Sequence, residues 1–326
     1  MAQHLFEIPG NPVPEQARAG LFNAEDGKTI RYAVVGATAR PLKGTVVVLP
    51  GRNECIEKYF ETMGDLSARG FTVAILDWRG QGGSCRLLRD SQRGHIDSFF
   101  DYTRDLEQFF QEVVLPDCRP PYYVLGHSTG GLIALLAAPA LINQVRRMVL
   151  CAPLIALKDL AISMLTLRRL MALLYNIGLG GMYISGGPRK PVPFAINRLT
   201  SDFARYERNA ALCDAHSHLA LGGPTVAWMH AACRAVETVQ DPDFVARITI
   251  PVLFIAAGAD EIVSTPAIED YARHLRAGSV VTIDGARHEI LQEADRYREQ
   301  FLAAFDAFVP GTDTEMWASR RPTQAA

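Results

Sequence analysis

The chain has 326 residues, of which 48% are hydrophobic and 21% are charged, and its formal net charge at pH 7 is -2. This composition is that of an ordinary globular protein, long enough to bury an extensive core. The small net charge predicts neither nucleic-acid binding nor strong attraction to an anionic surface, and it favours an enzyme that acts on a small molecule.

The start of the chain and its apolar segments predict no targeting signal and no membrane span. The first 20 residues lack the cationic start and apolar run of a secretory signal. The most apolar segments are 131–142, which is too short to cross a bilayer, and 160–179, which Arg168 and Arg169 interrupt. We therefore expect a cytoplasmic protein, in which the second segment can at most touch a membrane or lipid aggregate peripherally.

The cysteines argue against a metal site. There are six, and none forms the C-x-x-C spacing of a zinc site or a redox pair. A chain of this length also has little need of disulfide bonds. We expect free thiols, no bound metal and, for the chemistry derived below, no organic cofactor.

Seven short runs rich in β-branched residues are typical of buried strands. They cover residues 29–36, 45–50, 71–77, 122–126, 146–152, 251–258 and 279–284. Helical patterns separate most of them, over residues 56–70, 98–114, 129–142, 266–276 and 293–309. This alternation predicts an α/β fold with a mostly parallel central sheet and helices on both faces. In such sheets the functional groups lie at the carboxyl ends of the strands.

The alternation stops over residues 154–247, which contain no convincing strand. We predict a helical insertion there, in a core formed by residues 1–153 and 248–310. One face of its most apolar helix carries Leu160, Met164, Leu167, Met171 and Leu174, with Leu170 beside them. This stripe either packs the insertion onto the core, or lines an acyl pocket, or meets a lipid surface. We expect the first 20 residues, which carry three prolines, and the tail 311–326 to be poorly ordered.

A nucleophile is predicted where one strand meets a helix. Gly126-His127-Ser128-Thr129-Gly130 follows the strand 122–126 and opens the helix 129–142. The G-x-S-x-G pattern in this context predicts a nucleophile elbow, a strained turn whose neighbours must be small. The alternative is a small-residue turn where a helix packs on a sheet. We favour Ser128 as the nucleophile.

A serine nucleophile needs a base, and the base needs an acid that orients it. The chain order in this fold is serine, acid, histidine, each after a strand. Asp260 follows the strand 251–258 and His288 follows the strand 279–284, so we predict them as acid and base. Glu261 and Asp284 are close in sequence and are the rival acids. The other histidines lie at the start of the chain, in a loop before a helix, beside the serine, in the insertion or on a helix, and we interpret them as structural.

The tetrahedral intermediate also needs an oxyanion hole. One donor should be the backbone N–H of Thr129, which follows the nucleophile. The second should come from the loop after the strand 45–50, where Pro50 has no N–H and Gly51, Arg52 and Asn53 remain. We favour the Arg52 main chain; its side chain either positions a polar substrate head or is solvated. The glycine-rich segment 77–84 lacks the spacing of a phosphate loop, and we interpret it as a structural turn.

Several segments resemble one family in order. LPGRNECIEKY (49–59), LDWRGQGGS (76–84), RGHIDSFFDYTRDL (93–106), GHSTGG (126–131), GADEIVS (258–264) and GARHEI (285–290) are similar to the lysophospholipase and monoacylglycerol-lipase branch of the α/β-hydrolases. The resemblance implies the triad Ser128, Asp260 and His288, the oxyanion donors Arg52 and Thr129, and a cap at residues 154–247 that shapes an acyl pocket. Many members have a histidine-glycine pair where this chain has Pro50-Gly51, which leaves the donor in that loop less certain.

Together these observations predict a serine hydrolase that cleaves carboxylic esters with a single acyl chain, of monoacylglycerol or lysophospholipid type, through an acyl-enzyme. The alternatives are an acyltransferase, or an esterase on another small ester or a lactone. A catalytically silent ligand-binding α/β-hydrolase is disfavoured by the intact order of the triad. The sequence specifies no protein partner, head group, chain length or oligomeric state.

Overall fold

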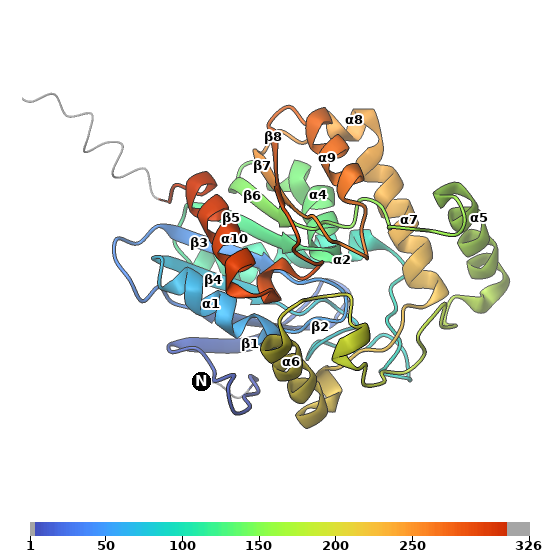
Figure 1. Ribbon diagram of the computed structural model, residues 1–326, viewed down its shortest axis with the longest axis horizontal. Helices are drawn as coiled ribbons and strands as arrows, with labels where there is room; N and C mark the ends of the chain where they lie inside the picture. Colours follow the sequence, from blue (N-terminus) through green and yellow to red (C-terminus); the bar gives the residue numbers. More distant parts are fainter. Residues whose placement is uncertain (1–3, 312–326) are drawn as a thin grey trace, which may run out of the picture.

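The computed structural model describes residues 4–311 and is built around one eight-stranded sheet of order β1-β2-β4-β3-β5-β6-β7-β8 (Figure 1). Only β1–β2 and β2–β4 are antiparallel pairs; every other pair is parallel. The predicted mostly parallel sheet is therefore confirmed. The strands are β1 (Ala17–Asn23), β2 (Thr29–Val35), β3 (Gly44–Leu49), β4 (Phe71–Leu76), β5 (Tyr122–His127), β6 (Val145–Cys151), β7 (Val252–Ala257) and β8 (Gly278–Ile283).

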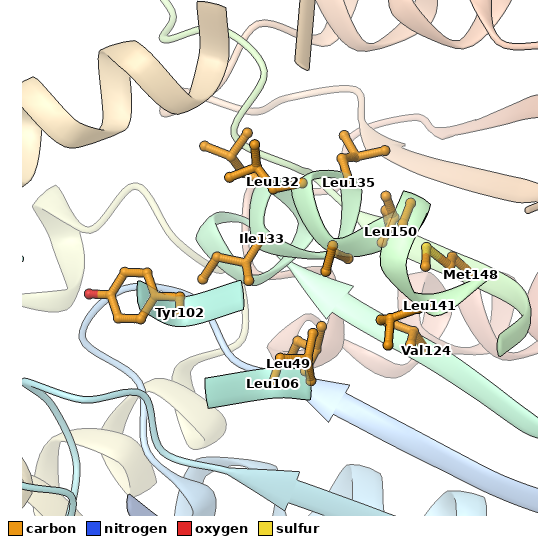
Figure 2. Close-up of a cluster of buried hydrophobic side chains, with 14 of the residues drawn as sticks. Leu49, Tyr102, Leu106, Val124, Leu132, Ile133, Leu135, Leu141, Met148 and Leu150 are labelled. Atoms are coloured by element: carbon orange, nitrogen blue, oxygen red, sulfur yellow. The ribbon is translucent and has the colours of Figure 1, made fainter. Parts of the chain in front are cut away.

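Helices cover both faces of the sheet because the central strands are apolar at every position. In β3, Val46 and Val48 face one layer, with α1 and α10, while Val47 and Leu49 face the other, with α2, α4, α7 and α9. Figure 2 shows part of the second layer: Leu49 and Leu106 lie together below α4, and Val124 lies beside Leu141. The core helices are α1 (Phe60–Ser67), α2 (Phe99–Phe109), α3 (Leu115–Asp117), α4 (Thr129–Leu141), α9 (Thr265–His274) and α10 (Asp295–Phe308), with the single turns η1 (Ile56–Tyr59), η2 (Phe110–Val114) and η6 (Ile290–Gln292).

The expectation that the first 20 residues are poorly ordered is wrong for the described residues. All seven residues of β1 pair with β2, so the sheet begins at residue 17. Before it, Leu5 is buried and the buried Asn11 side chain donates to the Glu57 carbonyl over 2.9 Å. Prolines interrupt regular structure but did not prevent this packing. The predicted tail 311–326 lies outside the described residues except for Gly311, whose carbonyl accepts from the Tyr123 hydroxyl.

Residues 154–247 form helices and contain no strand. They contain α5 (Met164–Leu174), α6 (Phe203–Ala215), α7 (Val226–Gln240) and α8 (Pro242–Val245), with the short turns η3 (Tyr175–Leu179), η4 (Phe194–Ile196) and η5 (Ser217–Leu219). The stripe on α5 packs against α7: Leu167 and Met171 are buried with Val226 and Cys233. Its buried members thus serve helix packing. None of the helices in residues 4–311 has both the length and the apolar character needed to cross a membrane.

Candidate active site

The turn between β5 and α4 holds Ser128 in a strained conformation. Its φ of 51° and ψ of -113° lie in a region that costs a residue with a side chain energy. Only glycine fits beside it, because a Cβ on Gly130 would lie 2.0 Å from the Leu49 carbonyl oxygen. Ser128 is thereby presented at the carboxyl edge of the sheet with 9% of its surface exposed. This is the geometry of a nucleophile elbow.

The structure brings Ser128, Asp260 and His288 together from the loops after β5, β7 and β8. Ser128 Oγ lies 3.0 Å from His288 Nε2, and His288 Nδ1 lies 2.8 Å from Asp260 Oδ2. Since a carboxylate only accepts, Nδ1 carries the proton and Nε2 is left to accept from the serine hydroxyl. A hydroxyl bonded to a free imidazole nitrogen can be deprotonated as it attacks an electrophile.

The Asp260 carboxylate is fixed as an anion. Its Oδ1 accepts from the backbone N–H groups of Ile262 (2.7 Å) and Val263 (2.9 Å), and Oδ2 from His288. Burial alone would raise the pKa of Asp260, but the hydrogen bond and charge of His288 and the two N–H groups outweigh it and hold that pKa below its usual value. The acid is therefore charged and oriented toward the imidazole.

The two rival acids lie away from this arrangement. The Glu261 side chain is 48% exposed and forms an ion pair with Arg198 over 3.4 Å. Asp284 is exposed on the surface, and among the described residues it forms no hydrogen bond or ion pair with His288. Of the other histidines, His95 bonds the Thr225 hydroxyl and His230 stacks on Tyr175. The structure thus separates the predicted acid from its neighbours in sequence.

The loop after β3 leaves one backbone N–H free beside the elbow. The Gly51 N–H donates to Glu54 Oε2, and the Asn53 N–H donates to Gln81 Oε1 over 3.3 Å. The Arg52 N–H has no acceptor in the described part of the chain. The same holds for Thr129, the first residue of α4, whose helix lacks a side-chain cap. Both predicted donors are therefore available to a ligand oxygen.

A buried network beneath the site was not predicted. Glu54, 5% exposed, accepts from Lys58 Nζ (2.9 Å), the Tyr59 hydroxyl (2.6 Å) and His127 Nδ1 (3.2 Å). Lys58 also bonds Glu289 Oε1 over 2.6 Å. Burial raises the pKa of Glu54, but the charges of Lys58 and His127 outweigh it and hold that pKa well below its usual value. The sequence signals that could have indicated this network are Glu54 in the segment PGRNE and His127 in the segment GHSTGG.

His127 connects the two loops on either side of Ser128. Its Nδ1 faces the Glu54 carboxylate, and its Nε2 lies 3.1 Å from the backbone carbonyl oxygen of His288. Both partners are acceptors, so both ring nitrogens donate only when the imidazole is protonated. Burial lowers the pKa of His127, but the charge of Glu54 outweighs it and raises that pKa above its usual value. Through these two contacts His127 joins the Gly51–Arg52 loop, by way of Glu54, to the loop that carries His288.

The described residues offer no metal site. No three histidine, cysteine, aspartate or glutamate side chains between residues 4 and 311 are grouped as ligands. All six cysteines are free thiols. The glycine-rich turn 77–84 is held by Asp77, whose carboxylate accepts from the Ile56 and Gly83 N–H groups and from Arg31. That carboxylate gives the turn a structural role.

Comparison with known proteins identifies a matching family model and several similar proteins. A family model described as serine aminopeptidase, S33 matches residues 40–295. Lysophospholipase L2 of Escherichia coli is 34% identical over 295 residues, covering 88% of this chain and 86% of that protein. Monoglyceride lipase of Rattus norvegicus is 27% identical over 255 residues, covering 77% of this chain and 75% of the lipase.

Solved structures show the same fold. The crystal structure of a soluble variant of monoglyceride lipase from Saccharomyces cerevisiae, in complex with a substrate analog, has a TM-score of 0.72 at 20% identity and covers 90% of this chain and 96% of that one. The monoacylglycerol lipase of Paleococcus ferrophilus has a TM-score of 0.68 at 22% identity, covering 87% and 99%. At these identities the structures establish the fold alone.

Proposed function

Since the chain belongs to the serine aminopeptidase, S33 family of α/β-hydrolases, in the branch of lysophospholipases and monoglyceride lipases, we propose that Ser128 cleaves the ester of single-chain lipids. The chain is a carboxylic ester hydrolase. The proposal adds the residues, the acyl-enzyme route and the substrates, which are monoacylglycerols or lysophospholipids. The observation that carries it is the hydrogen-bonded series Ser128, His288, Asp260 at the strand ends.

The reaction proceeds in two halves. Ser128 Oγ attacks the ester carbonyl carbon while His288 Nε2 takes its proton, and the imidazolium is stabilised by Asp260. His288 then gives that proton to the departing glycerol oxygen, leaving the acyl group on Ser128. Water repeats the sequence: His288 takes its proton, the acyl–serine bond breaks, and the fatty acid leaves while Ser128 regains its hydrogen.

The carbonyl oxygen becomes an anion in both tetrahedral intermediates. The free N–H groups of Arg52 and Thr129 are the donors proposed for it. Each lies on a fixed element, the loop after β3 and the first turn of α4, so little reorganisation is needed as the charge develops. The positive end of the α4 dipole favours the same charge.

We assign the chemistry to a core of residues 1–153 and 248–310, and substrate selection to a cap of residues 154–247. Two of the cap helices, α6 and α5, are held in different ways. On one side α6 forms ion pairs with α1, where Arg205 and Arg208 meet Glu61 at 2.6 and 2.8 Å. On the other, α5 packs against α7, which in turn packs against the core. The outer side of α5 and η3 is apolar and open, with Leu173 59% and Ile177 61% exposed, and we propose that it touches lipid aggregates.

A labelling experiment with a matched substrate panel tests the proposal. A fluorophosphonate probe should label the wild-type protein at Ser128 and should not label Ser128→Ala, because only an activated serine reacts. Esters of one alcohol with increasing acyl length should then show kcat/KM rising with chain length, since each buried methylene contributes about 0.8 kcal/mol. Absence of labelling at Ser128, or equal kcat/KM on acetate and long-chain esters, would contradict the proposal.

A further inference from the structure

Arg52 is an arginine in the interior for which the described residues provide no counter-charge. Its Nη1 donates to the Gly222 carbonyl over 2.9 Å, and its guanidinium carbon lies 5.7 Å from the centre of the Trp228 ring. No carboxylate of residues 4–311 lies within ion-pair distance of it, although its side chain is only partly open to solvent. Burial lowers the pKa of Arg52 to about 10.

The other interior arginines have the acidic partners that Arg52 lacks among the described residues. Arg31 meets Glu57 at 2.7 Å and Asp77 at 2.6 Å, and Arg79 meets Asp105 and Asp26. Removing a cation from water is expensive unless an anion or several acceptors replace the water. At Arg52 a single carbonyl does so, which leaves most of the five N–H donors of the guanidinium for something outside the chain.

The position of Arg52 restricts what that ligand can be. Its backbone N–H is a proposed oxyanion donor, so a substrate whose carbonyl oxygen is bound there has its alcohol portion within the reach of one arginine side chain. The guanidinium lies between the core and the cap, where Gly222 supplies the bonded carbonyl and a Cβ on Gly94 would come within 3.1 Å of Nη1. Glycine at position 94 therefore lets the guanidinium sit against the backbone of the core.

On the premise of the proposed function, we infer that the Arg52 guanidinium binds the phosphate of a monoacyl glycerophospholipid, and so directs the enzyme toward lysophospholipids over neutral monoacylglycerols. Phosphate matches the planar fork of arginine with two parallel hydrogen bonds. A monoacylglycerol offers hydroxyl groups at the same distance from its ester, which leave the guanidinium without an anion. The cation–π contact with Trp228 holds the fork in place when no phosphate is bound.

The competing explanation is that Arg52 only ties the cap to the core through Gly222. Arg86 provides the matched control for this. It too has no ion pair with the described acidic residues, and it donates to the cap carbonyls of His218 and Ala220. It lies on the loop after β4 and contacts no residue of the Ser128 site. If Arg52 only tethers the cap, replacing Arg52 and replacing Arg86 should have the same effect on substrate selection.

The test compares 1-acylglycerol with the corresponding 1-acylglycerol 3-phosphate, with the same acyl chain in the same detergent micelles. Arg52→Met should lower the ratio of kcat/KM for the phosphate ester to that for the neutral ester by about 10-fold or more, because a charge-assisted hydrogen-bonded contact is lost. Arg52→Lys should recover part of the ratio, since it restores the charge but not the fork. Arg86→Met should leave the ratio as it is in the wild type.

A binding measurement separates this inference from the proposed function. Titration calorimetry should show sn-glycerol 3-phosphate binding to the wild type, at least 10-fold weaker binding to Arg52→Met, and unchanged binding to Arg86→Met. Inorganic phosphate should bind more weakly than the glycerol ester; equal binding would mean a site for free phosphate and overturn the inference. So would an unchanged substrate ratio in Arg52→Met, or an equal fall in Arg86→Met. Failure to hydrolyse either ester would contradict the proposed function alone, since the titration does not depend on turnover.

Discussion

The carboxyl edge of the sheet and the outer side of α5 are built in opposite ways. At the sheet edge, Glu54, His127 and Asp260 are buried and every one of them has defined hydrogen-bond partners. On the outer side of α5 and η3, large apolar side chains such as Leu170, Leu173 and Ile177 face outward without a covering layer. The first arrangement fixes atoms to within a fraction of an ångström, as bond-making chemistry requires. The second arrangement does not hold side chains in defined positions, and it suits contact with a fluid apolar phase.

The largest effect of a substitution is expected at Ser128, at the carboxyl edge of the sheet. We expect Ser128→Ala to lower kcat for ester hydrolysis by about 10⁴-fold or more, because only binding and the oxyanion hole then remain. The measurement is turnover on a short and a long ester, with thermal unfolding to show that the fold is intact. Turnover near that of the wild type would end the assignment of Ser128.

Asp260→Asn should cost about 10⁴-fold in kcat, since a neutral amide no longer holds the imidazole in the required tautomer or stabilises its charge. KM should change little. Asp284→Asn is the matched control and should be close to the wild type, because Asp284 lies on the surface. If instead Asp284→Asn were inactive and Asp260→Asn active, the acid would be wrongly assigned.

His127→Gln tests the network that underlies the sheet edge. Because the pKa of His127 is raised above 6.5, its charge contributes stability that is fully present below pH 6.5 and is lost as the pH rises through the folded-state pKa. We expect His127→Gln to lower the free energy of unfolding by about 1–3 kcal/mol at acidic pH, and this deficit to shrink as the pH rises.

Urea unfolding at a series of pH values measures this effect. His274→Gln serves as the control, since the His274 side chain is 66% exposed on α9, and it should cost almost nothing. A deficit for His127→Gln that stays the same at every pH would show that His127 acts only by its size.

The smallest effect is expected on the outer side of α5. Leu173→Ser with Ile177→Ser should lower hydrolysis of substrate in anionic vesicles several-fold, because apolar area that enters the lipid is lost. Activity on a short, water-soluble ester should stay unchanged. The matched pair Leu167→Ser and Met171→Ser removes buried contacts with α7 and should instead lower the thermal stability of the protein. Equal loss on soluble and vesicle substrates by the outer pair would exclude a lipid-contact role.

The sequence alone determined the sheet core and the residues that follow its strands. Uninterrupted β-branched runs must be buried on both faces, so they predicted the strands now seen from β2 to β8. G-x-S-x-G marks a turn that only small residues permit, and parallel strands bring their carboxyl ends to one edge. Local sequence and chain order therefore placed Ser128, Asp260 and His288 at the same edge before any distance was known.

Only the tertiary structure decided the rest, because those features depend on contacts between residues distant in the chain. β1 has no β-branched residue and is mostly not buried, and it is held in the sheet by its pairing with β2. The availability of the Arg52 N–H follows from Glu54 and Gln81 occupying its two neighbours. The raised pKa of His127 follows from the Glu54 carboxylate 73 residues away, and its second contact is a carbonyl 161 residues away. The periodicity of a sequence cannot predict such long-range contacts, because nothing in the local sequence around either residue indicates its partner.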